Sequence, residues 1–374
     1  MTDFNTYKFG FIGLGLIGGS VAKAIRQYWP DAEIVAYNPS ADSLQEAMAD
    51  GVVNRGQCKE DGPVDGALFA ACDIVFLCAP VQKNAENLAA LKGHLKSTAI
   101  LTDIGSTKRD ILEHVTEAGM ERYFVGGHPM TGSERMRYRN SDPVLLQNAY
   151  YIIAPSKLTP MGKTVIMQEL VSGIRAIPLV IDCDFHDYAV AGISHLPHIV
   201  AYSLAATVKQ ADSDNGIMHT LAAGGFRDTT RIAASSPDMW EQICMTNGDN
   251  IVQLIDDYMK VLQEMRESIA SRSGEKLHDF FEDTAEYRRS YDTPSRSVGA
   301  TDELRLIYVD IEDRPGTLAE VVTLLAVNAV SIKNIGITHN REFQKGSLRV
   351  EFYSDADLEE ACGILEARNY TIYR

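Results

Sequence analysis

Tyr7-Lys-Phe-Gly-Phe-Ile-Gly-Leu-Gly-Leu-Ile-Gly-Gly-Ser20 is the stretch that decides the fold of the N-terminal part of this chain. A short apolar run ends at the first glycine of a Gly-x-Gly-x-x-Gly pattern, and a helical composition follows. In a strand–turn–helix unit these glycines permit the turn, admit a pyrophosphate and let the helix pack on the strand. Amide N–H groups at the helix start favour phosphate. The stretch therefore predicts a dinucleotide site rather than a purely structural turn, at Gly13, Gly15, Leu16, Ile17 and Gly18.

Length, charge and cysteine content restrict the class of protein. The 374 residues, 45% of them hydrophobic, predict two or three domains. A net charge of −16 opposes binding to nucleic acid or to anionic membranes, but allows an anionic substrate at a local cluster of cations. Six scattered cysteines without a Cys-x-x-Cys pair fit a reduced, cytoplasmic protein. We recognise no signal peptide and no uninterrupted apolar run of about 20 residues, so we expect no membrane span.

Strand and helix patterns alternate after the glycine turn. Residues 33–37, 73–79 and 99–104 have strand composition, and residues 84–95 have helical composition. This alternation predicts a doubly wound α/β domain of the Rossmann type, in which ligands bind beyond the carboxyl ends of the strands. Ala79 and Pro80, at one such strand end, are therefore predicted to contact the cofactor.

Asn38 ends the second predicted strand, where this fold meets the adenosine ribose. A carboxylate at this position favours NAD, whereas a nearby arginine favours NADP. An asparagine can bond a ribose hydroxyl without repelling a 2′-phosphate. The residue favours NAD and leaves NADP open, and its alternative role is to begin the Asn-Pro turn.

Two later strand ends carry polar groups into loops. Ser106 follows the strand at 99–104, where it can serve the ligand, cap the next helix, or do both. His128, in the segment Gly-Gly-His-Pro-Met-Thr-Gly-Ser-Glu, follows a strand that begins near residue 124. A lone histidine is usually structural, but this one lies at the edge where this fold binds ligands. Residues 150–154 and 177–181 complete the strands of a first domain, assigned to residues 1–178.

Helical patterns predominate from residue 185. His195 and His198 are three residues apart and share a helix face, and Pro197 between them should kink the helix or free a carbonyl. We expect hydrogen-bonding histidines and no metal, because no further ligands occur at metal spacing. Arg231 and Trp240 stand among small residues and can face a cavity, although a surface pair of Arg231 with Asp228 is the plainer alternative.

The helix predicted at 250–270 has a long apolar face. Because a mostly helical domain cannot easily bury this whole face, we expect a homodimer interface there. The second domain is assigned to residues 179–293. The polar residues 286–301 predict a linker. A β-α-β-β-α-β pattern of the ferredoxin type follows and defines a third domain, residues 302–374.

Five stretches together resemble the prephenate dehydrogenase family of tyrosine biosynthesis, over roughly residues 7–290. They are residues 13–20, 103–108, 127–134, 194–198 and 224–233, with Trp240. The Asp-Arg-Pro-Gly-Thr-Leu segment, residues 313–318, resembles an ACT domain, a small-molecule-sensing module. Thr131 stands where family members often have alanine, and Asn38 replaces their usual acidic residue.

The resemblance implies NAD(P)-dependent oxidative decarboxylation of prephenate to 4-hydroxyphenylpyruvate. His128 would accept a hydrogen bond from the ring hydroxyl, Ser106 would orient that hydroxyl or the imidazole, and Arg231 would bind a substrate carboxylate. It further implies that substrate is bound by Ser133, Glu134, His195, His198 and Trp240. It also implies that tyrosine or a related aromatic amino acid binds the tail at Asp313, Pro315, Gly316 and Leu318.

Three other functions stay open. The substrate could be arogenate, which carries an amino group where prephenate has a keto group. A β-hydroxyacid dehydrogenase shares the N-terminal fold, but would be expected to use a lysine where this chain has His-Leu-Pro-His. A non-enzymatic sensor would combine a dinucleotide domain with an amino-acid-binding tail, and the joint presence of His128, Ser106 and Arg231 argues against it.

Overall fold

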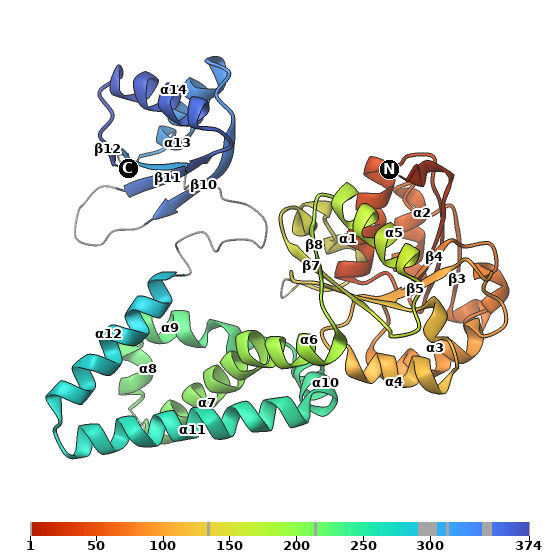
Figure 1. The fold of residues 1–374 in the computed structure, drawn as a ribbon, viewed down its shortest axis with the longest axis horizontal. Coiled ribbons are helices and arrows are strands. Elements are labelled where there is room, and N and C mark those ends of the chain that lie inside the picture. Colours follow the sequence, from red (N-terminus) through yellow and green to blue (C-terminus); the bar gives the residue numbers. More distant parts are fainter. Residues whose placement is uncertain are drawn as a thin grey trace. The chain divides into compact units, whose positions relative to one another are not determined.

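The computed structural model describes residues 2–132, 135–212, 215–290, 305–311, 314–338 and 346–373 (Figure 1). The predicted site residues Ser133, Glu134 and Asp313 lie outside the described residues. The chain forms two compact units, residues 1–262 and 263–374.

The first unit begins with a parallel five-stranded sheet in the order β3-β2-β1-β4-β5. Alternate residues of β1 bury into different cores, with Phe9 and Phe11 on one face and Ile12 on the other. Both faces are therefore covered, as expected for a doubly wound sheet. The strands are β1 (Lys8–Ile12), β2 (Glu33–Asn38), β3 (Arg55–Cys58), β4 (Ile74–Leu77) and β5 (Ile100–Asp103), and the helices are α1 (Leu16–Tyr28), α2 (Ala41–Ala49), α3 (Asn84–Leu91) and α4 (Arg109–Glu117). The predicted Rossmann-type fold is confirmed; the helix predicted at 84–95 ends earlier, at Leu91.

A second sheet of three strands lies beside β5, the outer strand of the first sheet. It contains β6 (Val125–Pro129), β7 (Tyr150–Pro155) and β8 (Ile177–Val180), with α5 (Met161–Gly173) before β8. A parallel bridge between Leu101 and Phe124 joins β5 to the start of β6. The carboxyl ends of β1, β4, β5 and β6 therefore share one edge, and β1 and β6 are three strand spacings apart, about 14 Å.

Helices make up the rest of the first unit. A π-helical turn, Ala191–His195, joins α6 (Cys183–Val190) to α7 (Leu196–Ala211). The turn ends two residues before Pro197, which has no N–H to donate to a carbonyl of that turn, and the predicted kink or free carbonyl stays a prediction. The other helices are α8 (Ile217–Leu221), α9 (Gly224–Thr230), α10 (Pro237–Thr246) and α11 (Gly248–Ala270), which extends into the second unit.

The continuous helical segment Cys183–Ala211 is long and apolar enough, by length and composition alone, to cross a membrane. Sequence reasoning passed over it because polar residues interrupt its apolar runs. Asp187 and His195 on this segment are each 1% exposed and hydrogen-bonded to other helices. The N-terminal half of the segment therefore packs as a helix within a protein domain.

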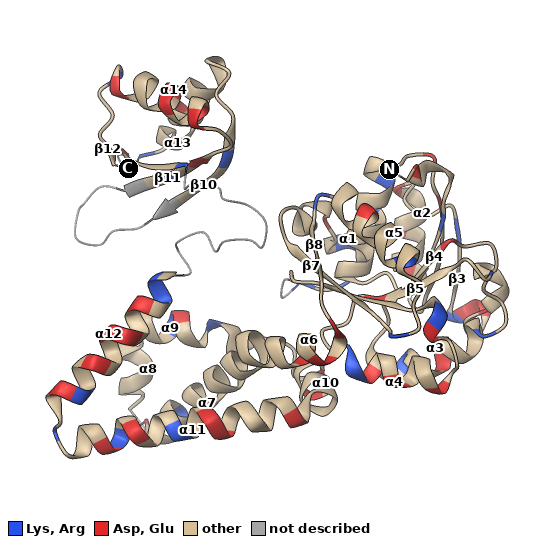
Figure 2. Cartoon of the chain, in the orientation of Figure 1, with Lys and Arg blue, Asp and Glu red and all other residues tan. Residues whose placement is uncertain are grey.

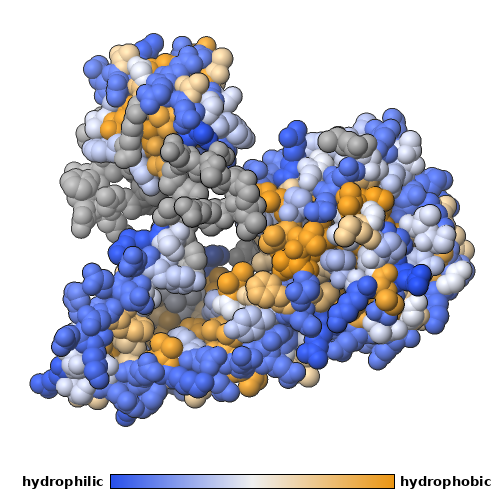
Figure 3. Space-filling model, in the orientation of Figure 1, coloured by the Kyte–Doolittle hydropathy of each residue, from blue (hydrophilic) through white to orange (hydrophobic). Residues whose placement is uncertain are grey.

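Apolar side chains stay exposed on the helical part of the chain (Figure 3). On α11, Ile251 is buried against α10, but Val261 and Leu262 are exposed. Ile193 on the π-helical turn is 69% exposed. This unburied apolar surface is what the prediction of a homodimer requires.

The second unit contains α12 (Gly274–Ser290), which sequence reasoning did not predict. Residues 286–290 were assigned to the linker and are helical instead, because Glu286, Arg288 and Arg289 are good helix formers that continue the preceding helix. Acidic residues lie along α11 and α12 (Figure 2). The rest of the predicted linker lies outside the described residues.

The tail forms an antiparallel sheet in the order β10-β11-β9-β12, with two helices. Its elements are β9 (Leu306–Ile311), α13 (Thr317–Val327), β10 (Ile332–Thr338), β11 (Gly346–Phe352), α14 (Asp355–Glu366) and β12 (Ile372–Tyr373). This is the predicted ferredoxin-like topology.

Candidate active site

The glycine turn has the shape that a dinucleotide needs. Gly13 has φ +101°, and a Cβ there would lie 2.8 Å from the backbone of Cys78. A Cβ on Gly18 would lie 2.9 Å from Cys78 Cβ, so these two glycines let β1 and α1 approach the end of β4. Gly15 is different, because nothing lies within 4 Å of a Cβ built there. No side chain caps α1, so Leu16 and Ile17, both half-buried, begin a helix whose N-terminus can receive phosphate.

The remaining predicted cofactor residues lie beside this turn or support it. Half-buried Ala79 and exposed Pro80 directly follow the Cys78 backbone that Gly13 approaches. Asn38 is only 6% exposed, and its amide is used internally: Oδ1 accepts from Leu14 N at 2.8 Å and Nδ2 donates to Ser40 O at 2.9 Å. Asn38 therefore holds the glycine turn in place, and its contact with a ribose stays a prediction.

Replacing Gly15 and Gly18 by alanine should separate cofactor binding from folding. Gly15→Ala introduces a Cβ into open space at an ordinary φ of −80°, so we expect a fall in Tm of under about 3 °C and a loss of NAD⁺ affinity of at least about tenfold. Gly18→Ala forces a 2.9 Å contact, so its main effect should be a lower Tm. Calorimetric titration and thermal unfolding measure the two effects. Unchanged NAD⁺ affinity in Gly15→Ala would remove the dinucleotide from this turn.

Asp103, at the end of β5, ties three segments together. Its carboxylate forms a buried ion pair with Lys108 Nζ and accepts from the N–H groups of Gly105 at 2.8 Å and Gly127 at 3.0 Å. Lys108 is fully buried and Asp103 is 4% exposed. The pair therefore fixes the loop that carries Ser106 against the strand that carries His128.

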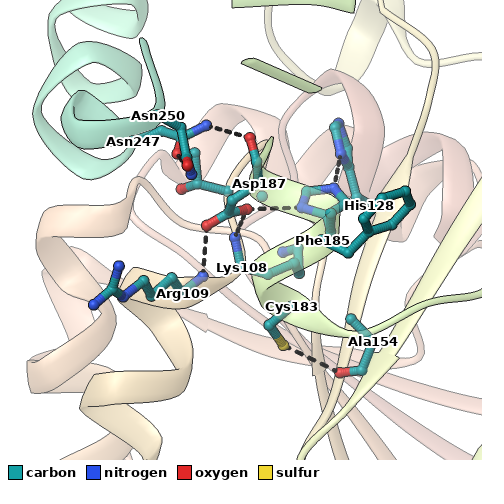
Figure 4. Close-up of polar contacts among 12 residues, drawn as sticks. Lys108, Arg109, His128, Ala154, Cys183, Phe185, Asp187, Asn247 and Asn250 are labelled. Atoms are coloured by element: carbon teal, nitrogen blue, oxygen red, sulfur yellow. Dashed lines mark hydrogen bonds and ion pairs between the residues drawn. The ribbon is translucent and has the colours of Figure 1, made fainter. Parts of the chain in front are cut away.

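Ser106 does not cap α4, which was one of its two predicted roles. The Ncap residue is Lys108, and its side chain makes no capping bond. Asp187, from α6, supplies the cap instead: Oδ1 accepts from Lys108 N at 2.7 Å and Oδ2 from Arg109 N at 2.9 Å (Figure 4). An anionic carboxylate at a helix N-terminus is electrostatically favoured. Half-buried Ser106 lies in the loop just before this cap.

His128 is joined to the same carboxylate through a second histidine. His128 Nδ1 lies 2.8 Å from His186 Nε2, and His186 Nδ1 lies 2.7 Å from Asp187 Oδ1. His186 and Asp187 are at most 1% exposed, whereas His128 is half-buried. Figure 4 shows His128 and Asp187 at the two ends of this chain of bonds. Among the residues described in the structure, His128 Nε2 has no hydrogen-bond partner.

The surroundings of His128 keep it neutral. Burial, with the cationic Lys108 and the histidines His186 and His195 nearby, lowers the pKa of His128 well below its usual value of 6.5. Burial also lowers the pKa of His195 to about 4. Both imidazoles are therefore uncharged at neutral pH, and His128 can act as a base.

His195, His198 and Trp240, each predicted to bind substrate, lie together. Trp240 stacks on His198 with ring centroids 3.9 Å apart, and His195 meets the indole edge-on at 6.0 Å. His198 Nδ1 must donate to the carbonyl of Ser194 at 2.9 Å, which leaves Nε2 as an acceptor. Asn247 Nδ2 lies 3.2 Å from His195 Nδ1, and since the amide can only donate, His195 presents Nε2–H as a donor. Trp240 Nε1 is buried and unpartnered within the described residues, as suits a donor awaiting a ligand oxygen.

Arg231 begins a 3₁₀ turn, Arg231–Ala234, and is exposed. Tyr202 on α7 donates to Ser235 O at 3.0 Å, which holds the end of this turn against the helix that carries His198. Among the described residues, no cluster of three or more His, Cys, Asp or Glu side chains could hold a metal ion.

Two models of a known protein family match the sequence of this chain. Residues 21–178 match the model "Prephenate dehydrogenase, nucleotide-binding domain", and residues 182–283 match "Prephenate dehydrogenase, dimerization domain". The chain is 34% identical to the prephenate dehydrogenase of Bacillus subtilis (strain 168), over 95% of each protein. The chain belongs to the prephenate dehydrogenase family. It is an NAD-dependent oxidoreductase, as predicted, and the predicted family is confirmed.

Solved structures agree with this assignment. The prephenate dehydrogenase of A. aeolicus, in complex with hydroxyphenyl propionate and NAD⁺, superposes with a TM-score of 0.70 at 27% identity, covering 76% of this chain and 98% of that one. The arogenate dehydrogenase of Synechocystis gives 0.67 at 27% identity, covering 76% and 99%. Because both activities occur among the structural neighbours, the fold alone does not choose between the two substrates.

Sequence reasoning missed several residues that build the site: Asp103, Lys108, His186, Asp187 and Asn247. Asp103 and Lys108 lie within the segment 103–108 that resembles the family, and His186-Asp187 lies within the helical pattern that begins at residue 185. A His-Asp pair at the start of a helix, upstream of two further histidines, was an available signal. Nothing in the sequence said which distant groups the pair would meet.

Proposed function

We propose that this chain catalyses the oxidative decarboxylation of prephenate to 4-hydroxyphenylpyruvate with NAD⁺. The observation that supports it most is the neutral, half-buried His128, whose Nε2 has no partner in the described structure. It lies on the sheet edge that also carries the glycine turn, about three strand spacings away. NAD⁺, when bound, supplies the hydride acceptor.

His128 has the properties of the base that this reaction needs. The ring hydroxyl donates to Nε2, and its proton passes to the imidazole as the hydroxyl-bearing carbon is oxidised. Loss of the ring carboxylate as carbon dioxide then aromatises the ring to a phenolate, which takes the proton back from the imidazolium, so the protein mainly positions the substrate and moves one proton. Half-buried Ser106 lies in the loop between β5 and α4, from which it would orient the hydroxyl.

The helical side of the site offers groups suited to the polar ends of prephenate. His195 supplies a neutral N–H donor, Trp240 a buried N–H donor, and His198 an acceptor. These donors suit a keto group or a carboxylate. Arg231 is assigned to a substrate carboxylate, since its planar fork matches one. The predicted roles of Ser133 and Glu134 in binding substrate also stay proposals.

Arg231→Gln should raise the KM for prephenate by about tenfold or more and change kcat less, because a carboxylate loses its charged partner. Steady-state kinetics at saturating NAD⁺ measure this. Arg227→Gln, on the neighbouring α9, is a matched control for the loss of one positive charge. Equal KM values in the two variants would place the carboxylate elsewhere.

The test of the proposed function is NADH formation from prephenate and, separately, from arogenate, with NAD⁺ and with NADP⁺. We expect the highest kcat/KM with prephenate and NAD⁺. Arogenate carries an ammonium group, which an acidic partner would favour, whereas the described donors favour a keto group. A higher kcat/KM with arogenate would overturn the choice of substrate, and no turnover of either would overturn the proposed reaction.

We assign the ferredoxin-like tail to an ACT domain that binds tyrosine or a related aromatic amino acid. The predicted turn begins α13, where exposed Gly316 has φ +94° and Leu318 is 40% exposed. Pro315 and Leu318 flank a backbone that few residues other than glycine adopt. Ligand capture at this turn, with Asp313 as a further partner, stays a proposal.

Removal of residues 302–374 should abolish any effect of tyrosine on turnover and leave kcat within about threefold, because the catalytic groups all lie in the first unit. Initial rates with and without tyrosine, for the full and the shortened chain, measure this. Unchanged inhibition by tyrosine in the shortened chain would reject the tail as its binding site.

The exposed apolar surface of the helical domain and the match to a family dimerization domain support a homodimer. All six cysteines are described and none forms a disulfide, which fits the proposed cytoplasmic location.

A further inference from the structure

We propose that His186 and Asp187 are positioning residues that fix the tautomer of His128, so that Nε2 is always the basic atom. The inference rests on the proposed function, since it assigns to His128 Nε2 the proton of the substrate hydroxyl. It is carried by the hydrogen-bond chain Asp187–His186–His128, whose direction we infer from the carboxylate at its buried end.

The buried carboxylate of Asp187 sets the direction in which the hydrogen bonds of this chain are donated. Asp187 is 1% exposed, and its carboxylate already accepts from two backbone N–H groups at the start of α4. A carboxylate held by these donors is an acceptor, so His186 Nδ1, 2.7 Å away, carries the proton. The other nitrogen of a neutral imidazole is then an acceptor. His186 Nε2 therefore accepts from His128 Nδ1–H at 2.8 Å.

This tautomer decides which nitrogen of His128 can take up a proton. With its proton held on Nδ1, neutral His128 presents the lone pair of Nε2 to the site. When Nε2 takes the hydroxyl proton, Nδ1 keeps its own. The new imidazolium then donates to His186, whose other nitrogen donates to Asp187. The carboxylate thus stabilises the positive charge through one intervening ring, without contact with the substrate.

The same carboxylate joins two parts of the site. Asp187 lies on α6, and the helix it caps follows the loop that carries Ser106. Asn247 Nδ2 donates to the carbonyl of Asp187 at 2.7 Å and also reaches His195. Helix α6 is thereby held between the dinucleotide-binding sheet and the helices that carry His195 and Trp240. The orientation of the base therefore depends on how these domains pack.

The first test is ¹⁵N NMR of histidine-labelled protein without substrate, with the His128 signals assigned by their loss in His128→Asn. We expect a protonated Nδ1 and an unprotonated Nε2 for His128 at neutral pH. A protonated Nε2 in the native protein would overturn the inference, and this measurement needs no altered His186.

The second test is His186→Phe, which keeps the ring and removes both nitrogens. We expect kcat with prephenate to fall about 10- to 100-fold, with the KM for prephenate and the Kd for NAD⁺ within about threefold. The protonated Nδ1 signal of His128 should give way to the Nε2–H form. His114→Phe is the matched control; His114 lies on α4, pairs weakly with Asp110 at 3.9 Å, and should leave kcat unchanged.

Each failure has a distinct signature. Normal kcat in a folded His186→Phe enzyme would overturn the positioning role. Absence of turnover by the native protein, together with the expected ¹⁵N pattern, would reject the proposed function and keep the tautomer assignment.

Discussion

His128→Asn should lower kcat by about 10²- to 10⁴-fold and leave the KM for prephenate within a few fold, because the imidazole acts on the proton that moves in the transition state. Asparagine can still hydrogen-bond His186 but cannot take up a proton. Steady-state and single-turnover kinetics with NAD⁺ measure the effect. Turnover near that of the native enzyme would remove His128 from the mechanism.

The same residue sets the acid limb of the pH profile. His128 must be neutral to act, and burial together with nearby Lys108, His186 and His195 places its pKa well below 6.5. As pH falls through 6.5, the folded enzyme therefore keeps the basic form that a free histidine would lose. We expect kcat/KM at pH 6.0 to be within about twofold of its value at pH 7.5, with the decline at lower pH. A half-maximal point at or above pH 6.5 would contradict this.

Asp103→Asn should be the most destabilising of these substitutions. It leaves the charge of Lys108 fully buried without its partner, and breaking such a pair costs about 3–5 kcal/mol. For a unit of this size that is a fall in Tm of roughly 6–20 °C. Thermal unfolding of the purified protein measures it.

Asp73→Asn is the matched control. Asp73 pairs with Lys96 at 2.5 Å, but both side chains are partly exposed, so its loss should cost about 0–1 kcal/mol. Adding Lys108→Met to Asp103→Asn should recover part of the stability, because the charge of Lys108 is then no longer buried without its partner. Equal Tm values for the two single variants would show that the buried pair does not stabilise the site.

Much of the fold could be predicted from local patterns in the sequence. The glycine turn, the continuous apolar strands and the alternation with helices determined the Rossmann-type domain, because these features act over a few neighbouring residues. The same holds for the ferredoxin-like tail. Helix α12 was missed at the boundary with a polar segment, where composition distinguishes a solvated helix poorly from a linker.

For the candidate site, too, some residues could be predicted from the sequence and the roles of others could not. His128, His195, His198 and Trp240 were identifiable because each lies at a predicted strand end or on a recognisable helical stretch. Asn38 was assigned to the ribose, yet its amide turned out to support the glycine turn. Ser40 is only two residues further along the chain, but Leu14 becomes a neighbour through the pairing of β1 with β2.

By itself, the sequence determined that this chain has a dinucleotide turn, a histidine at the neighbouring ligand edge and a separate small tail. The tertiary structure alone decided that Asp187 caps α4, 78 residues away from Arg109, and reaches His128 through His186. The physical reason is that a local motif is specified by adjacent residues, whereas the proton position on an imidazole is set by whichever donor or acceptor folding brings to its other nitrogen.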